Sequence, residues 1–181
     1  RVYEQAVQAT PPDSPDLPMY LNNLGTGLRA RYARTGQLAD LAEAIRVYEQ
    51  AVQGTPPDSP DLPSLLNNLG NGLRDRYAAT GQLADLVEAI RVYEQVVQAT
   101  PPDSPARPSR LNNLGTGLSA RYAATGQLAD LAEAIRVTEQ AVQGTPPDSP
   151  ALPMYLNNLG AGLSARYAAT GQLADLAEAI R

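Results

Sequence analysis

Residues 46–90 read RVYEQAVQGTPPDSPDLPSLLNNLGNGLRDRYAATGQLADLVEAI, and the rest of the chain repeats this pattern with few substitutions. The copies open at Arg1, Arg46, Arg91 and Arg136, so the period is 45 residues and the 181 residues hold four copies and one further residue. Self-similarity at such a period is typical of arrays in which each unit packs against its neighbours. The sequence predicts a single array over residues 1–181, with repeats at 1–45, 46–90, 91–135 and 136–180.

The first half of each copy has the periodicity of an amphipathic helix. Four leucines follow one another at spacings of 4, 3 and 4 residues, namely Leu17, Leu21, Leu24 and Leu28. This spacing places them on one face of a helix, and we expect that helix over about residues 16–35. Either Ser14 or Asp16 can cap its start, and Gly36 suits the left-handed conformation that ends many helices.

The second half of each copy predicts a helix from about Asp40 to about Gly54. We interpret Asp40 and Glu43 as a capping box, a role that explains both carboxylates without catalysis. The Pro56-Pro57 pair stops the helix because proline lacks the donor for the next helical hydrogen bond. The expected buried face consists of Leu41, Ala44, Ile45, Tyr48, Ala51 and Val52. No stretch alternates with period two for long enough to form a strand, so the predicted fold class is all-α.

The composition excludes most enzyme chemistry. The chain contains no histidine, cysteine or lysine, so it lacks the usual metal ligands, the thiol and imidazole nucleophiles and the Schiff-base lysine. A formal net charge of −5 differs from the basic footprint of nucleic-acid-binding proteins. No apolar run approaches the roughly 18 to 20 residues that cross a bilayer. We expect a cytoplasmic protein that is not an enzyme, holds no metal or cofactor, and binds neither nucleic acid nor membrane.

Both ends of the sequence lie at the same phase of the repeat. The chain starts without methionine, and Arg181 is the equivalent of Arg1. We therefore expect a fragment of a longer chain. Because both ends interrupt a helix, we also expect exposed apolar surface there and end-to-end self-association.

The motif residues resemble the tetratricopeptide repeat (TPR) family, a family of helix-pair arrays. The pattern is carried by Leu21, Leu24, Gly25 and Leu28 and then by Ala44, Tyr48, Ala51 and Pro56, with Leu21, Leu28 and Tyr48 replacing the family's tryptophan, tyrosine and phenylalanine. The long period is similar to kinesin light chain-type repeats. The resemblance implies a right-handed α-solenoid of helix-turn-helix repeats, and in such relatives the array is a recognition module beside an NTPase or protease-like domain.

A second stripe lies opposite the leucines on the first helix. It consists of Met19, Asn23, Thr26 and Ala30, and the resemblance implies that it lines a concave groove. Amides can pair with an extended peptide backbone, and arginine can hold a carboxylate. The predicted peptide-binding residues are Asn23, Asn68, Asn113, Asn158, Thr26, Asn71, Thr116, Arg29 and Arg74. The open alternatives are that Asn22 or Asn23 hydrogen-bonds a loop carbonyl of the adjacent repeat, and that the arginines are solvated charges that bind nothing.

Two hypotheses of function follow. The first is a non-enzymatic scaffold that binds a protein or extended peptide in the groove. The second is a structural spacer or self-assembling rod with no groove ligand, and a consensus-designed array is a third interpretation.

Thr138 replaces the large aromatic side chain of Tyr3, Tyr48 and Tyr93, so we predict that the last complete helix pair is the loosest.

Overall fold

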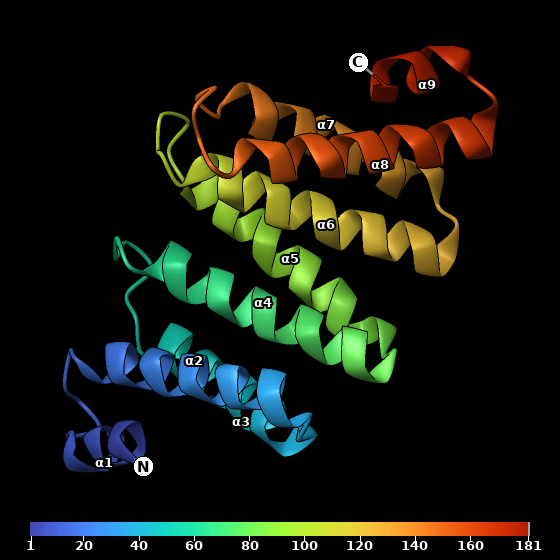
Figure 1. The fold of residues 1–181 in the computed structure, drawn as a ribbon. Coiled ribbons are helices and arrows are strands. Elements are labelled where there is room, and N and C mark those ends of the chain that lie inside the picture. Colours follow the sequence, from blue (N-terminus) through green and yellow to red (C-terminus); the bar gives the residue numbers. More distant parts are fainter. Residues whose placement is uncertain (181) are drawn as a thin grey trace. The chain divides into compact units, whose positions relative to one another are not determined.

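The computed structural model describes residues 1–180, and within that range all regular structure is helical (Figure 1). The first helices of the repeats, α2, α4, α6 and α8, begin at intervals of 45 residues, which confirms the all-α fold and the period. The helices are α1 (Val2–Ala9), α2 (Leu17–Thr35), α3 (Leu38–Gln53), α4 (Leu62–Thr80), α5 (Leu83–Ala99), α6 (Arg107–Thr125), α7 (Leu128–Gln143), α8 (Leu152–Thr170) and α9 (Leu173–Ile180).

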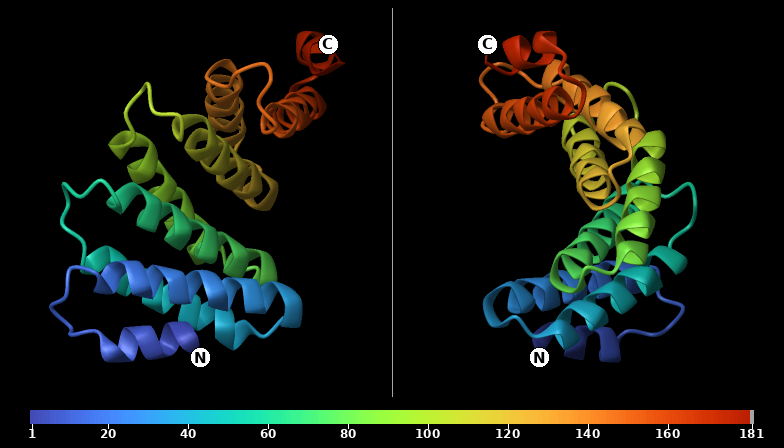
Figure 2. Two further views of the ribbon diagram at one scale, coloured as in Figure 1. Left: turned by 60° about the vertical axis from the view of Figure 1, so that its left-hand side comes forward. Right: turned by 90° about the vertical axis from the view of Figure 1, so that its right-hand side faces the viewer.

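The chain divides into two compact units, Arg1–Val96 and the part from Val97 onward, so the boundary falls inside α5. In the first unit, α2 packs against α1 and α3, α3 packs against α4, and α2 touches α4. In the second unit, α6 packs against α7, α7 against α8, and α8 against α9. Figure 2 shows the side-by-side pairing of α2 with α3, in blue to cyan.

The first helix of each repeat has the predicted bounds. Helix α2 begins at Leu17 with Pro18 in its first turn, where proline removes no helical hydrogen bond. Neither candidate cap is confirmed, because Asp16 occupies the N-cap position without a side-chain bond, and the Ser14 hydroxyl accepts from the Asp16 amide at 3.3 Å. At the other end Gly36 has φ 68°, the left-handed conformation that the sequence predicted.

The predicted start of the second helix was wrong. Helix α3 begins at Leu38, two residues before Asp40, and its N-cap is Gln37 without a side-chain bond. Asp40 lies inside the first turn, where its carboxylate accepts two hydrogen bonds from Arg31, at 2.7 Å from Nε and 2.6 Å from Nη2. The carboxylate therefore fastens the end of α2 to the start of α3 instead of capping the helix.

The buried face of α3 agrees with the prediction except at two positions. Leu41, Ala44, Ile45, Tyr48 and Ala51 are all buried, as expected. Val52, however, is only half-buried, whereas Val47 was not expected in the core and is fully buried. The reason is that α3 is covered from two sides, by α2 of its own repeat and by α4 of the next.

Candidate functional site

The stripe predicted to bind peptide is partly open on α2. The side chain of Met19 is 50% exposed, and Thr26 and Ala30 are also exposed. Asn23 is half-buried, and its side chain has no hydrogen-bond partner among residues 1–180. Asn23 therefore keeps both amide groups available on this surface.

The equivalent asparagines of later repeats join consecutive first helices. Asn68 donates from Nδ2 to Oδ1 of Asn22 at 2.8 Å, so α4 is bonded to α2. In the second unit Asn158 donates in the same way to Asn112 at 2.9 Å, which bonds α8 to α6. In both units the partner therefore lies in the adjacent repeat, but it is an asparagine side chain on the neighbouring first helix and not the expected loop carbonyl. Each of these amides retains one N–H and its oxygen for other partners.

Two further stripe residues contact the tyrosines of the second helices. The phenol of Tyr93 donates to Oδ1 of Asn71 at 2.7 Å, and that of Tyr48 lies 3.3 Å from the Thr26 hydroxyl. Thr116 has no tyrosine at the equivalent place, and its hydroxyl donates to the carbonyl of Asn112 at 2.9 Å. Burial raises the pKa of the Tyr93 phenol to about 12, so this phenol stays protonated and keeps its hydrogen bond even at a pH where an exposed tyrosine is ionised.

The tyrosine rings lie directly on glycine backbones of the first helices. A Cβ atom added to Gly25 would lie 2.6 Å from Cε1 of Tyr48, and one added to Gly70 would lie at the same distance from Cε1 of Tyr93. Gly27, Gly72 and Gly162 instead face the second helix of the preceding repeat, since a Cβ on Gly72 would lie 3.2 Å from Cγ1 of Ile45. Glycine at this position therefore allows the close approach of a neighbouring helix.

The two arginines predicted to bind peptide, which lie beside the stripe, are paired within the first unit. Arg29 donates to Oδ2 of Asp75 from Nε at 3.0 Å and from Nη2 at 2.7 Å, and Arg74 lies 3.4 Å from the other carboxylate oxygen. Burial acts to lower the pKa of Arg29, but the hydrogen bonds and charge of Asp75 outweigh it and raise that pKa above its ordinary value. This bridge joins α2 to α4 and covers Tyr48, whose side chain has no exposed surface.

The second unit lacks this cover. The positions of Tyr48, Arg29 and Asp75 are occupied there by Thr138, Ser119 and Ala165. An open cavity of about 270 Å³ lies among these three side chains and is lined by residues of α6, α7 and α8. The expectation that this helix pair is the loosest stays a prediction, and the cavity is the structural feature that supports it.

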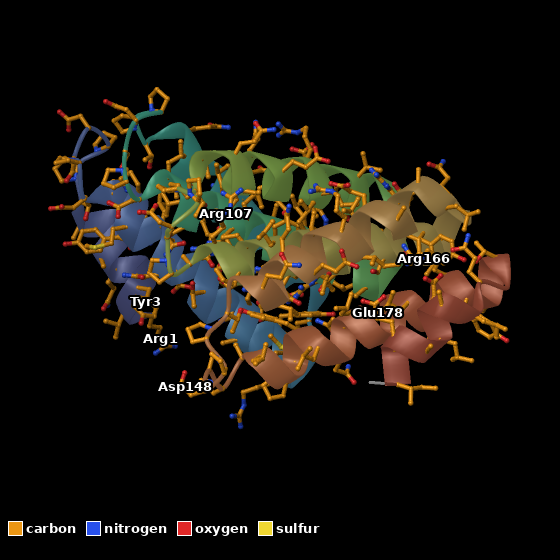
Figure 3. All side chains as sticks on the ribbon, turned by 90° about the horizontal axis from the view of Figure 1, so that it is seen from above. Arg1, Tyr3, Arg107, Asp148, Arg166 and Glu178 are labelled. Atoms are coloured by element: carbon orange, nitrogen blue, oxygen red, sulfur yellow. The ribbon has the colours of Figure 1, made fainter. Side chains whose placement is uncertain are left out.

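A recurring ion pair holds the two helices of each repeat together. The pairs are Arg31–Asp40, Arg76–Asp85, Arg121–Asp130 and Arg166–Asp175, each with an N–O distance of 2.6 Å and a buried aspartate. The guanidinium of Arg31 holds the pKa of the Asp40 carboxyl below its ordinary value. Figure 3 labels Arg166 of the last pair on α8. Glu43 and Arg46 form an exposed ion pair on α3, at 2.5 Å.

Two larger hollows lie among the proline-rich connections. One of about 480 Å³ in the first unit lies between the connections that precede α2 and α4. One of about 650 Å³ in the second unit has the same place before α6 and α8, and Arg107 is among its lining residues. The Arg107 guanidinium donates to the carbonyls of Val97 and Thr100 at 3.0 and 2.5 Å, so it fastens the preceding connection.

The chemistry of the described residues is that of surfaces and hydrogen bonds. Residues 1–180 contain no group of three or more acidic side chains placed to hold a metal ion. Over the same range, no helix combines the length and apolarity that spanning a membrane requires.

Sequence reasoning missed the pairing between consecutive first helices. The bonds Asn22–Asn68, Arg29–Asp75 and Asn112–Asn158 all join residues 46 positions apart, one repeat plus one residue. The sequence contained a signal for this pairing. The first copy has Arg29, and the second copy has Asp75 at the stripe position that alanine occupies in the other copies. A comparison of columns at the same repeat position cannot reveal it, since the contact register is offset by one.

Comparisons with known proteins agree with this architecture. A family model described as tetratricopeptide repeat matches residues 19–61, 64–106 and 109–151. A crystal structure of the nearly identical TPR-like repeats of a putative kinesin light chain from Podosopora anserina is 20% identical, with a TM-score of 0.68 over 98% of this chain and 82% of that one. A point variant of those Podosopora anserina repeats is 25% identical, with a TM-score of 0.64 over 90% of this chain and 72% of that one.

BtubC (BKLC) from P. vanneervenii has a similar structure. It is 22% identical and has a TM-score of 0.69 over 99% of this chain and 70% of that one. No curated protein matches the sequence. The resemblance expected from the residues is confirmed by the family match and by these structural neighbours.

Proposed function

Because the chain belongs to the tetratricopeptide repeat family, whose members are protein-interaction scaffolds, we propose that it binds a protein or extended peptide along the stripe of its first helices. The observation that carries this proposal is the stripe on α2, where Met19, Thr26 and Ala30 are exposed and Asn23 has unused amide groups. Exposed apolar atoms beside amide donors and acceptors suit a peptide backbone with its side chains.

The proposed residues have unequal roles. Asn23 and its equivalents Asn68, Asn113 and Asn158, together with Thr26, Asn71, Thr116, Arg29 and Arg74, form the proposed surface. Asn68 and Asn158 each donate one N–H to an asparagine of the preceding first helix. Each therefore offers the ligand one remaining donor and one acceptor. Arg29 and Arg74 already contact Asp75, so an acidic ligand has to compete with that carboxylate.

Peptides selected from a displayed random library against the purified array provide the test. Met19→Arg and Ala30→Arg place bulky charges on the stripe, while Ala42→Arg places the same charge on an exposed position of α3 as a matched control. We expect both stripe variants to reduce peptide affinity at least tenfold and the control to leave it unchanged. Loss of affinity in Ala42→Arg alone would move the binding surface away from the stripe and reject the proposal.

The spacer or rod is the second candidate function. It is favoured by the bonds that join consecutive first helices on and beside the stripe, namely Asn68 with Asn22 and Arg29 with Asp75. On this hypothesis the library yields no ligand, and light scattering shows a molar mass that rises with protein concentration. A monomer that binds selected peptides excludes the rod.

A further inference from the structure

In the first unit, a tyrosine ring and an ion pair fill the space behind the stripe. The Tyr48 ring lies on Gly25, its hydroxyl is 3.3 Å from that of Thr26, and its side chain is fully buried. Arg29 interacts with the same hydroxyl and bonds Asp75 of the next first helix at 2.7 Å. The first unit thus contains a binding site for a phenol ring, which the Tyr48 side chain occupies and the Arg29–Asp75 ion pair covers.

In the second unit, all three closing side chains are truncated at once. Thr138 replaces Tyr48, Ser119 replaces Arg29, and Ala165 replaces Asp75. The other two neighbours of the ring are unchanged, because Gly115 and Thr116 are the same residue types as Gly25 and Thr26. Thr138 turns its hydroxyl back to the carbonyl of Ala134 at 2.8 Å and rests on Gly115. The space beyond it is the cavity of about 270 Å³, whose lining includes Thr116, Ser119, Leu131, Asn158 and Ala165.

We propose that this cavity binds a phenol ring, supplied either by a free phenolic compound or by a tyrosine side chain of a bound chain. The internal template gives the pose. The ring lies beside Gly115 and Thr138, as the Tyr48 ring lies on Gly25, and its hydroxyl reaches Thr116. Because the Thr116 hydroxyl donates to the carbonyl of Asn112, its lone pairs accept the phenol hydrogen.

The dimensions and chemistry of the cavity fit this ligand. A cavity of about 150 Å³ in another protein is large enough for benzene, so 270 Å³ admits a substituted ring. Leu131, Ala165 and the glycine backbone supply apolar contact, and Thr116 and Ser119 supply hydroxyl groups. A phenol matches both, whereas a purely aliphatic ligand has no hydrogen to donate to the lone pairs of these hydroxyl groups. This site goes beyond the proposed peptide surface, because a free ring can occupy it without any bound chain.

Titration of the full chain with p-cresol, followed by ligand-observed NMR, tests the proposal. We expect saturable binding with a dissociation constant of the order of 1 mM or tighter, as the ligand's eight heavy atoms allow. Toluene, which lacks the hydroxyl, is expected to bind about 2- to 10-fold more weakly. Thr138→Tyr refills the cavity and is expected to weaken p-cresol at least tenfold, while Thr125→Tyr, the same change at an exposed position of α6, leaves binding unchanged.

A second variant keeps the test decisive if Thr138→Tyr does not fold. The double variant Ser119→Arg with Ala165→Asp rebuilds the covering ion pair at its register of 46 residues and is also expected to exclude p-cresol. Undiminished binding to either folded variant, or no saturable binding to the unaltered chain, would overturn the proposal. Competition by capped Gly-Tyr-Gly but not by capped Gly-Phe-Gly assigns the ring to a bound chain. Binding of p-cresol without such competition assigns it to a free phenolic compound, and both results support the site.

Discussion

The same substitution at two equivalent glycines is expected to have opposite effects on stability. Gly25 in α2 and Gly160 in α8 occupy the same column of the repeat. An alanine Cβ at Gly25 would lie 2.6, 2.8 and 2.9 Å from three ring atoms of Tyr48, which is fully buried. At Gly160 the nearest atom among the described residues is the Ala179 carbonyl oxygen, at an ordinary contact distance of 3.7 Å.

The magnitudes follow from two opposing terms. Replacing glycine by alanine inside a helix stabilises it by about 1 kcal/mol at either position. At Gly25 the overpacking of a rigid ring costs about 3 kcal/mol, because the phenol is held at Thr26 and the ring cannot withdraw without breaking that contact. We therefore expect Gly25→Ala to destabilise by about 2 kcal/mol and Gly160→Ala to stabilise by about 1 kcal/mol.

Thermal unfolding followed by circular dichroism measures the difference. For a chain of this size, about 1 kcal/mol corresponds to roughly 2–4 °C in Tm. Gly25→Ala should thus lower the Tm of the chain by about 4–8 °C, and Gly160→Ala should raise it by about 2–4 °C. Equal Tm shifts of the same sign in both variants would refute the reasoning, because helix propensity alone would then determine the effect at both glycines.

Three further predictions concern the ionisable groups. Asp75→Asn removes the carboxylate that pairs with Arg29 and should destabilise by about 1 kcal/mol, and the effect measured by urea unfolding should shrink in 1 M salt. The pKa of Asp40 is lowered by Arg31, so its stabilisation is complete above the ordinary pKa of about 3.9 and is lost as the pH falls through the folded value. The Tm difference between the unaltered chain and Asp40→Asn should accordingly close as the pH falls from about 5 to about 2. In an absorbance titration of the phenols, Tyr93→Phe should remove the component that titrates at about 12, and an unchanged high-pH component would assign it to another tyrosine.

The sequence was sufficient for the helices because their signals are local. The leucine spacing and Gly36 set the bounds of α2, which agree with the structure to one residue. The start of α3 failed because Asp40 is a good N-cap by type and is also the carboxylate that Arg31 reaches across the turn. A bidentate bond between arginine and a carboxylate is among the stronger hydrogen-bonded pairs, and Asp40 makes this bond in the structure instead of capping the helix.

The candidate site was less predictable because it depends on contacts between repeats. Helical spacing placed Asn23, Asn68 and Asn158 on one stripe, but it carried no information on the offset of 46 residues that bonds Asn68 to Asn22. The cavity required three truncations to be combined, at Thr138, Ser119 and Ala165, that are remote in sequence. Only the loss of the aromatic ring at Thr138 was evident from a single column.

Ion pairs within the chain compete with a charged ligand, so the ligand gains most binding free energy where no such pair is present. An acidic ligand that approaches Arg29 must displace Asp75, which is fixed at 2.7 Å on the neighbouring helix and therefore acts at an effective concentration of millimolar order or higher. No such competitor exists among the described residues at Ser119, where the equivalent of Asp75 is Ala165. The charged part of the stripe in the first unit thus favours packing between repeats, and the truncated part in the second favours an external partner. Ser119→Arg without a compensating aspartate should consequently create an arginine open to acidic peptides, and a gain in their affinity absent from the Ser119→Arg/Ala165→Asp variant would measure this competition directly.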